Sequence, residues 1–170
     1  LIDNKKKFFM ANYKIIGSDK ELKKISKKAQ YALITTGQIK NSKIRESLFY
    51  KALNNGFKFP IIISPKSYIS KHASIGQGTI VMHGSIINAG AKIGKNCIIN
   101  SKSLVEHDAI IGDHCHLATR STVNGGAIIK NNTFIGSGSI IKQNIEIGKN
   151  CFVNANLFVR KNLKDNSKIL

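Results

Sequence analysis

The chain has 170 residues, of which 27 are Lys or Arg and nine are Asp or Glu, so its formal net charge is +18. Its length fits one mid-sized domain or two small ones, and an apolar content of 42% supports a packed core rather than a disordered chain. An odd count of three cysteines argues against a disulfide scaffold, and no apolar run has the length of a membrane span. We therefore expect a folded, cytoplasmic protein with no membrane partner.

The positive charge comes almost entirely from lysine, because arginine occurs only at Arg45, Arg120 and Arg160. Arginine is the usual bidentate reader of phosphate and guanine, and no aromatic residues alternate with the lysines to stack on bases. The composition therefore favours anionic small substrates over nucleic acid as partners.

The first 60 residues follow the pattern of a small α/β unit. Residues 13–17 predict a short strand, and Ser18 predicts the N-cap of a helix over residues 19–29. Residues 30–36 predict a second strand, and residues 41–54 predict a second helix that ends at Asn55 and Gly56. This order indicates a partial Rossmann-like unit, a candidate nucleotide-sugar-binding domain over residues 1–60.

From residue 63 onward the sequence repeats every six residues. Seventeen consecutive sixth positions, from Ile63 to Val159, are Ile, Val or Leu. A second register, from Ser67 to Leu157, is Ser, Thr, Ala or Cys at fourteen of its sixteen positions. One large and one small inward residue per hexad is typical of a parallel β-helix, in which three short strands make a coil of eighteen residues. The unbroken phase predicts stacked coils, without inserted loops, in a mainly β domain over residues 61–170.

The repeat also predicts roles for its glycines and cysteines. Five glycines follow an inward aliphatic residue, and two Lys-Asn pairs occupy similar places; both suit corners that need positive φ. These are Gly76, Gly94, Gly112, Gly136 and Gly148, with the pairs at 95–96 and 149–150. Cys97, Cys115 and Cys151 share the small inward position, so we expect them to be reduced, buried and inert.

Among the five histidines, His107 stands out because Glu106 and Asp108 flank it in a chain with few acids. A carboxylate can fix one imidazole nitrogen and make the other a better proton acceptor, as a general base requires. An exposed histidine in a turn explains the same residues equally well. His114 and His116 form an HxH pair that we expect to be ordinary polar surface, so we predict no metal site.

The segment from Asn100 to His116 resembles a characteristic stretch of the left-handed β-helix sugar acetyltransferases. The resemblance continues through Asn-Gly-Gly at 124–126 and Ile-Gly-Ser-Gly-Ser at 135–139, and covers nearly the whole chain. That family comprises the sialic acid O-acetyltransferases and the UDP-4-amino-sugar N-acetyltransferases of bacterial glycan synthesis. The resemblance implies a left-handed parallel β-helix that forms a homotrimer, with intersubunit active sites and acetyl-CoA in the groove between neighbouring helices.

The resemblance also implies roles for residues around His107. His107 would be the general base, and Asp108, or Glu106 in its place, would orient the imidazole. His116 matches a histidine that contacts the reacting ends of the ligands, and Asn100 matches an asparagine of the acceptor site. His107 and His116 lie on different faces of the repeat, so a site that uses both would draw them from different subunits.

Five glycine and polar positions complete the implied site. The Gly125 N–H matches the backbone N–H that stabilises the thioester oxygen in the family. Gly136 and Ser137 match cofactor-binding positions. Asp3 and Gly37 match positions on the nucleotide side. The relatives also begin with a glycine-rich turn that holds the nucleotide phosphates, which this chain does not show; we expect either an incomplete copy or an acceptor without a nucleotide.

These observations predict an acetyl-CoA-dependent acetyltransferase that acts on an amine or hydroxyl of a bacterial glycan sugar, either a UDP-amino sugar or a sialic acid. The alternative is a non-catalytic β-helix scaffold or binding subunit. The scaffold hypothesis predicts that His107→Ala leaves function intact.

Overall fold

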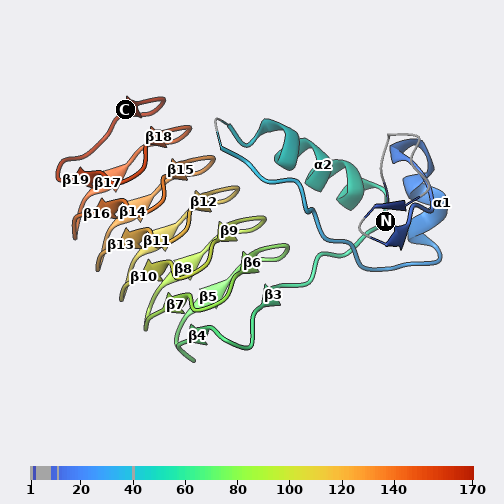
Figure 1. Ribbon diagram of the computed structural model, residues 1–170, viewed down its shortest axis with the longest axis horizontal. Helices are drawn as coiled ribbons and strands as arrows, with labels where there is room; N and C mark the ends of the chain where they lie inside the picture. The colour runs from blue at the N-terminus through green and yellow to red at the C-terminus, as the bar shows by residue number, and fades with distance from the viewer. Residues whose placement is uncertain (1, 3–8, 11, 40) are drawn as a thin grey trace.

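The computed structural model describes residues 2, 9–10, 12–39 and 41–170, and it has a long β-helix with a smaller helical unit beside it (Figure 1). The β-helix strands have two residues each: β3 (Ile62–Ile63), β4 (Tyr68–Ile69), β5 (Ser74–Ile75), β6 (Ile80–Val81), β7 (Ile86–Ile87), β8 (Lys92–Ile93), β9 (Ile98–Ile99), β10 (Leu104–Val105), β11 (Ile110–Ile111), β12 (His116–Leu117), β13 (Thr122–Val123), β14 (Ile128–Ile129), β15 (Phe134–Ile135), β16 (Ile140–Ile141), β17 (Glu146–Ile147), β18 (Phe152–Val153), β19 (Phe158–Val159) and β20 (Lys168–Ile169). Each strand ends on or just after an inward aliphatic residue of the repeat, so the parallel β-helix predicted from the sequence is confirmed.

Three parallel sheets form the walls of the helix. We name them by their middle strands: the β10 sheet runs β4-β7-β10-β13-β16-β19, the β11 sheet β5-β8-β11-β14-β17, and the β12 sheet β3-β6-β9-β12-β15-β18-β20. Neighbouring strands pair eighteen residues apart, as in Ile62 with Ile80, so no loop interrupts the coils. Only the last coil is shorter, because Phe152 pairs with Lys168.

The inward aliphatic and small side chains fill the interior of the helix. From Val81 to Val159 every aliphatic residue of the repeat is buried, and Ile87, Ile99 and Ile129 are among those with no exposed surface. All three cysteines are buried and free, as expected. Burial in this apolar column raises the pKa of the Cys115 thiol well above its usual value, which keeps it protonated and unreactive.

The corners between the strands have one fixed backbone conformation. Every sixth residue from Gly78 to Asn156 has positive φ, and this position is occupied by Gly, Asn, Asp, His, Lys or Arg. Asn96 and Asn150 of the Lys-Asn pairs are among them. The five glycines that follow the aliphatic residue are not, so that explanation was wrong for them. They are glycines because coils approach closely there: a Cβ on Gly76 would lie 2.6 Å from the backbone of Gly94.

The N-terminal unit contains fewer regular elements. Strand β1 (Phe9–Met10) pairs antiparallel with β2 (Tyr13–Lys14), followed by a 3₁₀ turn η1 (Asp19–Glu21), helix α1 (Leu22–Ser26) and helix α2 (Lys43–Asn54). Ser18 precedes the first helical turn as predicted, and its backbone N–H donates to Glu21 Oε2 at 3.0 Å. The predicted helix over 19–29 is shorter than expected, whereas α2 matches its prediction and ends before Gly56, which has a φ of +93°.

Residues 30–36 do not form the predicted second strand. A single parallel bridge joins Tyr31 to Lys58, and the rest of the segment has no neighbouring strand in the described residues. The carbonyls of Ile34 and Thr36 instead accept hydrogen bonds from Arg45 Nη1. A buried guanidinium has therefore replaced the sheet ladder as the partner of this backbone.

Arg45 also joins the N-terminal unit to the β-helix. Its side chain is 1% exposed, and Nε donates to the Asn96 carbonyl at 3.2 Å. Burial lowers the pKa of Arg45 to about 10, and the side chain remains charged near neutral pH. Gln38 Nε2 donates to the His114 carbonyl at 2.7 Å, so two buried polar side chains hold residues 34–38 against the corner that carries His114.

Candidate active site

His107 lies on the corner between β10 and β11, which we call the His107 corner (residues 106–108 and their equivalents in each coil). Its side chain is 67% exposed, and Nδ1 lies 3.0 Å from Asp108 Oδ2. Asp108 has a φ of +59°, a conformation that Asp adopts more readily than most residues. The short carboxylate therefore reaches the imidazole and fixes one of its nitrogens, leaving Nε2 as the nitrogen available for chemistry.

Glycines one coil away on each side make room for this pair. Gly125 is eighteen residues after His107, and a Cβ there would lie 2.6 Å from Nε2. Gly90 is eighteen residues before Asp108, and a Cβ there would overlap Asp108 Oδ1. A side chain at either position would displace the imidazole or the carboxylate. The two glycines therefore leave the space that the His107–Asp108 pair occupies.

Gly125 lies against the imidazole, and its N–H donates no hydrogen bond within the described part of the chain. The next residue, Gly126, donates its N–H to the His107 carbonyl at 3.0 Å, which ties the two coils together at this point. A free backbone donor next to a fixed imidazole can stabilise negative charge on an oxygen that reacts there.

Glu106 does not contact His107. Its Oε2 accepts a hydrogen bond from Asn88 Nδ2 at 2.8 Å, so its carboxylate is directed toward the preceding coil. Asp108, rather than Glu106, is therefore the acid that orients the imidazole in this structure.

Asn100 and His116 form a second pair. Asn100 Nδ2 donates to His116 Nε2 at 3.3 Å, and His116 Nδ1 lies 2.6 Å from the Gln38 carbonyl, to which it donates. His116 is 8% exposed, and its ring contacts Phe134 edge to face. Burial lowers the pKa of His116, which keeps the ring neutral with its proton on Nδ1.

The expectation that His114 and His116 are polar surface was wrong. His114 is 2% exposed; its Nδ1 accepts from Asn96 Nδ2 at 2.9 Å, and Tyr50 of α2 covers the other side of the ring. Burial lowers the pKa of His114 as well. Both histidines sit beneath the N-terminal unit, which the sequence pattern did not indicate.

The two pairs lie on opposite sides of the β10 sheet, at the two corners where its strands begin and end. We call these two sides its edges. His107 is on the corner that follows β10, whereas Asn100 is on the corner that precedes it (residues 100–102 and their equivalents, the Asn100 corner). No hydrogen bond or ring contact joins His107 to Asn100 or His116 in the described residues. The outer face of the sheet between them is apolar and exposed, with Tyr68 at 59% and Phe158 at 51%.

The remaining predicted residues are more scattered. Gly136 and Ser137 lie on the Asn100 corner two coils further along, where a Cβ on Gly136 would lie 2.5 Å from the Ala155 nitrogen. Gly37 is exposed, with open space where a Cβ would be, directly before the Gln38 anchor. Asp3 falls outside the described residues.

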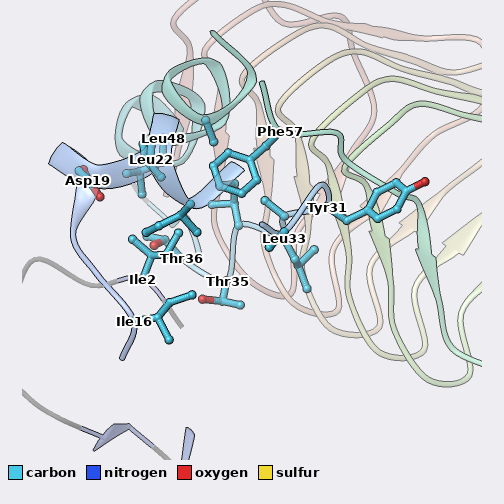
Figure 2. Close-up of a pocket in the computed structure, with 15 residues that line it drawn as sticks. Ile2, Ile16, Asp19, Leu22, Tyr31, Leu33, Thr35, Thr36, Leu48 and Phe57 are labelled. Carbon is cyan, nitrogen blue, oxygen red and sulfur yellow. The ribbon is translucent and has the colours of Figure 1, made fainter. Parts of the chain in front are cut away.

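A cavity of about 310 Å³ lies within the N-terminal unit (Figure 2). Its wall is mostly apolar and comes from α1, α2 and residues 31–36, with Leu22, Leu48 and Phe57 on one side. Of the predicted site residues that the structure describes, none lines this cavity. The chemistry-bearing groups are instead on the open corners of the β-helix.

Within the described ranges, no three His, Cys, Asp or Glu side chains gather closely enough to hold a metal ion. The helices described there are also too short and too polar to cross a membrane.

Fold and site together define a parallel β-helix with an imidazole–carboxylate pair at one of its corners. Residues 72–106, 90–125 and 126–161 match the model of the bacterial transferase hexapeptide (six repeats) family, and the chain belongs to that family. Its sequence matches no curated protein.

Several solved structures share the fold. A mutant of perosamine N-acetyltransferase from Caulobacter crescentus, in complex with CoA and GDP-perosamine, is 28% identical, with a TM-score of 0.89 over 98% of this chain and 79% of that one. WeeI from Acinetobacter baumannii is 28% identical, with a TM-score of 0.85 over 98% and 80%. The acetyltransferase domain of PglB from Neisseria gonorrhoeae, with acetyl coenzyme A, has a TM-score of 0.90 over 98% and 80% at 24% identity, which shows a shared fold.

Asn88, Gln38 and the role of Arg45 were not predicted from the sequence. Asn88 could have been found, because it stands eighteen residues before Glu106 and the repeat places the two side by side. Gln38 and Arg45 gave no such signal, since they belong to the segment without a repeat.

Proposed function

We propose that this protein is an acetyl-CoA-dependent acetyltransferase that acetylates the amine of a nucleotide-linked amino sugar, with His107 as general base. The observation that carries the proposal is the His107–Asp108 pair set against Gly125. The perosamine N-acetyltransferase with CoA and GDP-perosamine bound supports both ligand classes. Sialic acid is the alternative acceptor, and the same assay tests it.

The chain's own groups account for the transfer. The acceptor nitrogen attacks the thioester carbonyl, a C–N bond forms, and negative charge develops on the carbonyl oxygen beside the Gly125 N–H. His107 Nε2 takes the proton that the nitrogen loses, while Asp108 stabilises the imidazolium. The C–S bond then breaks, and the imidazolium returns the proton to the departing thiolate. The products are the N-acetyl sugar and free CoA.

A homotrimer would complete the site. The exposed apolar outer face of the β10 sheet is a suitable subunit interface, because burying it removes large apolar side chains from water. This sheet has His107 on one edge and Asn100, Gly136 and Ser137 on the other. Packing of subunits through its outer face would therefore set the His107 corner of one subunit beside the Asn100 corner of the next. The donor and acceptor would then lie in the groove between them.

Basic residues further along the His107 corner suit the phosphates of acetyl-CoA. Lys142 and Arg160 occupy the position of Glu106 two and three coils later, and coils stack at about 4.8 Å. Arg160 also lies over the Phe158 ring at 5.0 Å from its centroid. The thioester end would therefore lie at Gly125 and the anionic end at Arg160.

The N-terminal unit would contribute to the acceptor site. It has its own apolar cluster, around Phe49 and Phe57, distinct from that of the β-helix, which supports a division into residues 1–60 and 61–170. Gly37 lies next to Gln38, which touches His116, so the acceptor would be bounded by this segment. Free, buried cysteines support a reducing, cytoplasmic location.

The test is release of free CoA from acetyl-CoA with a panel of nucleotide amino sugars and sialic acids. We expect turnover with an amino sugar and a loss of about 100-fold or more in His107→Ala, as for removal of a general base. His72→Ala is the matched control, because His72 is exposed on the same edge two coils earlier and should leave turnover unchanged. Gly125→Ala should lose activity while keeping its fold, since the imidazole can move aside.

The scaffold alternative gives the opposite result. It predicts no turnover by the wild type with any acceptor and no difference between the wild type and His107→Ala in partner binding. Turnover that survives His107→Ala would overturn the assignment of the base while keeping the enzyme class.

A further inference from the structure

Glu106 is a carboxylate that the proposed chemistry leaves unused. It lies next to the general base in a chain with 27 Lys and Arg residues and nine acids. No side-chain nitrogen of Lys, Arg or His in the described part of the chain comes within 4.0 Å of its carboxylate oxygens, whereas Glu146 pairs with Lys130 at 2.6 Å. A negative group without a cationic partner beside a reaction site is available to a ligand.

Asn88 holds this carboxylate in place. The bond from Asn88 Nδ2 to Glu106 Oε2, 2.8 Å long, uses one carboxylate oxygen and leaves Oε1 without a partner in the described residues. Both residues occupy the same position of the repeat in consecutive coils, so the pair runs along the His107 corner. A fixed carboxylate with one free oxygen can accept a directed hydrogen bond from a cation.

The order of groups along the corner separates donor from acceptor. The imidazole of His107 lies against Gly125, one coil toward the C-terminus, where the thioester oxygen would bind. Glu106 extends to Asn88, one coil toward the N-terminus. The carboxylate is therefore on the side of the imidazole opposite the donor, where an acceptor would approach.

We infer that Glu106, positioned by Asn88, is a specificity-determining residue that binds the acceptor through its ammonium group and so selects amines over hydroxyls. This inference rests on the proposed acetyltransferase function. The acceptor binds as R–NH₃⁺ and releases one proton to solvent. The second proton passes through His107 to the leaving thiolate as the C–N bond forms, so the step stays balanced. A hydroxyl acceptor has no charge for Glu106 to bind.

The test compares Glu106→Gln with the wild type, using an amino sugar nucleotide and its analogue with a hydroxyl at the same carbon. The variant keeps the shape of the side chain and an oxygen for Asn88. We expect KM for the amine to rise about 10- to 100-fold, the effect of losing a hydrogen bond to a charged group, with a smaller change in kcat. The inhibition constant of the hydroxyl analogue should change less than about threefold, as for a neutral contact.

Two further variants isolate the cause. Glu106→Asp should recover part of the affinity for the amine, because it restores the charge. Glu146→Gln removes the same charge on the β11 sheet and should leave both constants unchanged. An unchanged KM for the amine in Glu106→Gln, or equal weakening of both ligands, would overturn the inference while wild-type turnover upholds the acetyltransferase. Absence of turnover by the wild type would overturn both.

Discussion

The β-helix and the N-terminal unit are held together by different means. In the β-helix each coil repeats the same interactions, with an inward aliphatic residue, a small residue and a positive-φ corner every six positions. The N-terminal unit has a small apolar cluster and depends on a few buried polar anchors, Arg45 and Gln38 among them. The β-helix therefore depends on one large repeated core, whereas the unit beside it depends on a small cluster and a few polar contacts.

The largest expected effect is in the β-helix core. Ile129→Ala removes a side chain with no exposed surface and leaves a cavity that the stacked coils cannot close. We expect a loss of about 2–5 kcal/mol in the free energy of unfolding, measured by denaturant titration. Ile44→Ala in α2 is the control, because Ile44 is 67% exposed and its loss should change stability by less than about 0.5 kcal/mol. Equal effects would contradict the assignment of Ile129 to a tightly packed core.

A smaller and more local effect is expected at Arg45. Arg45→Met leaves the Ile34, Thr36 and Asn96 carbonyls without their donor, at a cost of about 1–3 kcal/mol. Hydrogen exchange should accelerate in residues 31–39 and remain slow in the β-helix strands. Lys43→Met, on an exposed position of the same helix, serves as the control. Faster exchange throughout the β-helix would contradict a local effect of Arg45.

The smallest effect is a dependence on pH that arises where the two regions meet. Burial lowers the pKa of His114 and of His116 from the usual value of 6.5, so the unfolded chain takes up protons before the folded one. Their contribution to stability is present above pH 6.5 and is lost as the pH falls through the folded-state pKa values.

This dependence can be measured as the melting temperature between about pH 7.5 and pH 5, the range in which histidine titrates. His114→Gln removes one of the two groups and should lose less stability on acidification than the wild type. A variant with the same acid-induced loss would contradict the assignment of His114 as a buried neutral group.

The same contrast explains what the sequence could predict. The period of six determined the strands, coil length, core and cysteine positions, because every hexad repeats one local rule. The pair at His107 and Asp108 could be recognised because the two residues are adjacent. The close approach at Gly76 could not, since its reason is the backbone of the next coil rather than its own conformation.

The N-terminal unit could not be predicted in the same way, because its structure depends on contacts between distant segments. Residues 30–36 have the apolar pattern of a strand, but the carbonyls of Ile34 and Thr36 accept hydrogen bonds from Arg45. A charged residue in a predicted helix gives no sign of such a contact. His114 and His116 look like surface residues until α2 and Gln38 cover them. Contacts between segments about 75 residues apart leave no periodic trace in either segment.

The most direct test of the central claim, a transferase whose site is shared between subunits, is complementation in mixed trimers. His107→Ala and Asn100→Ala damage opposite edges of the β10 sheet, and each variant alone should release little CoA. In hybrids isolated with two different tags, one subunit's intact His107 corner can face a neighbour's intact Asn100 corner. Each isolated hybrid would then have one whole site of its three, so about a third of the sites would return CoA release. Hybrids no more active than their parents would contradict the shared site.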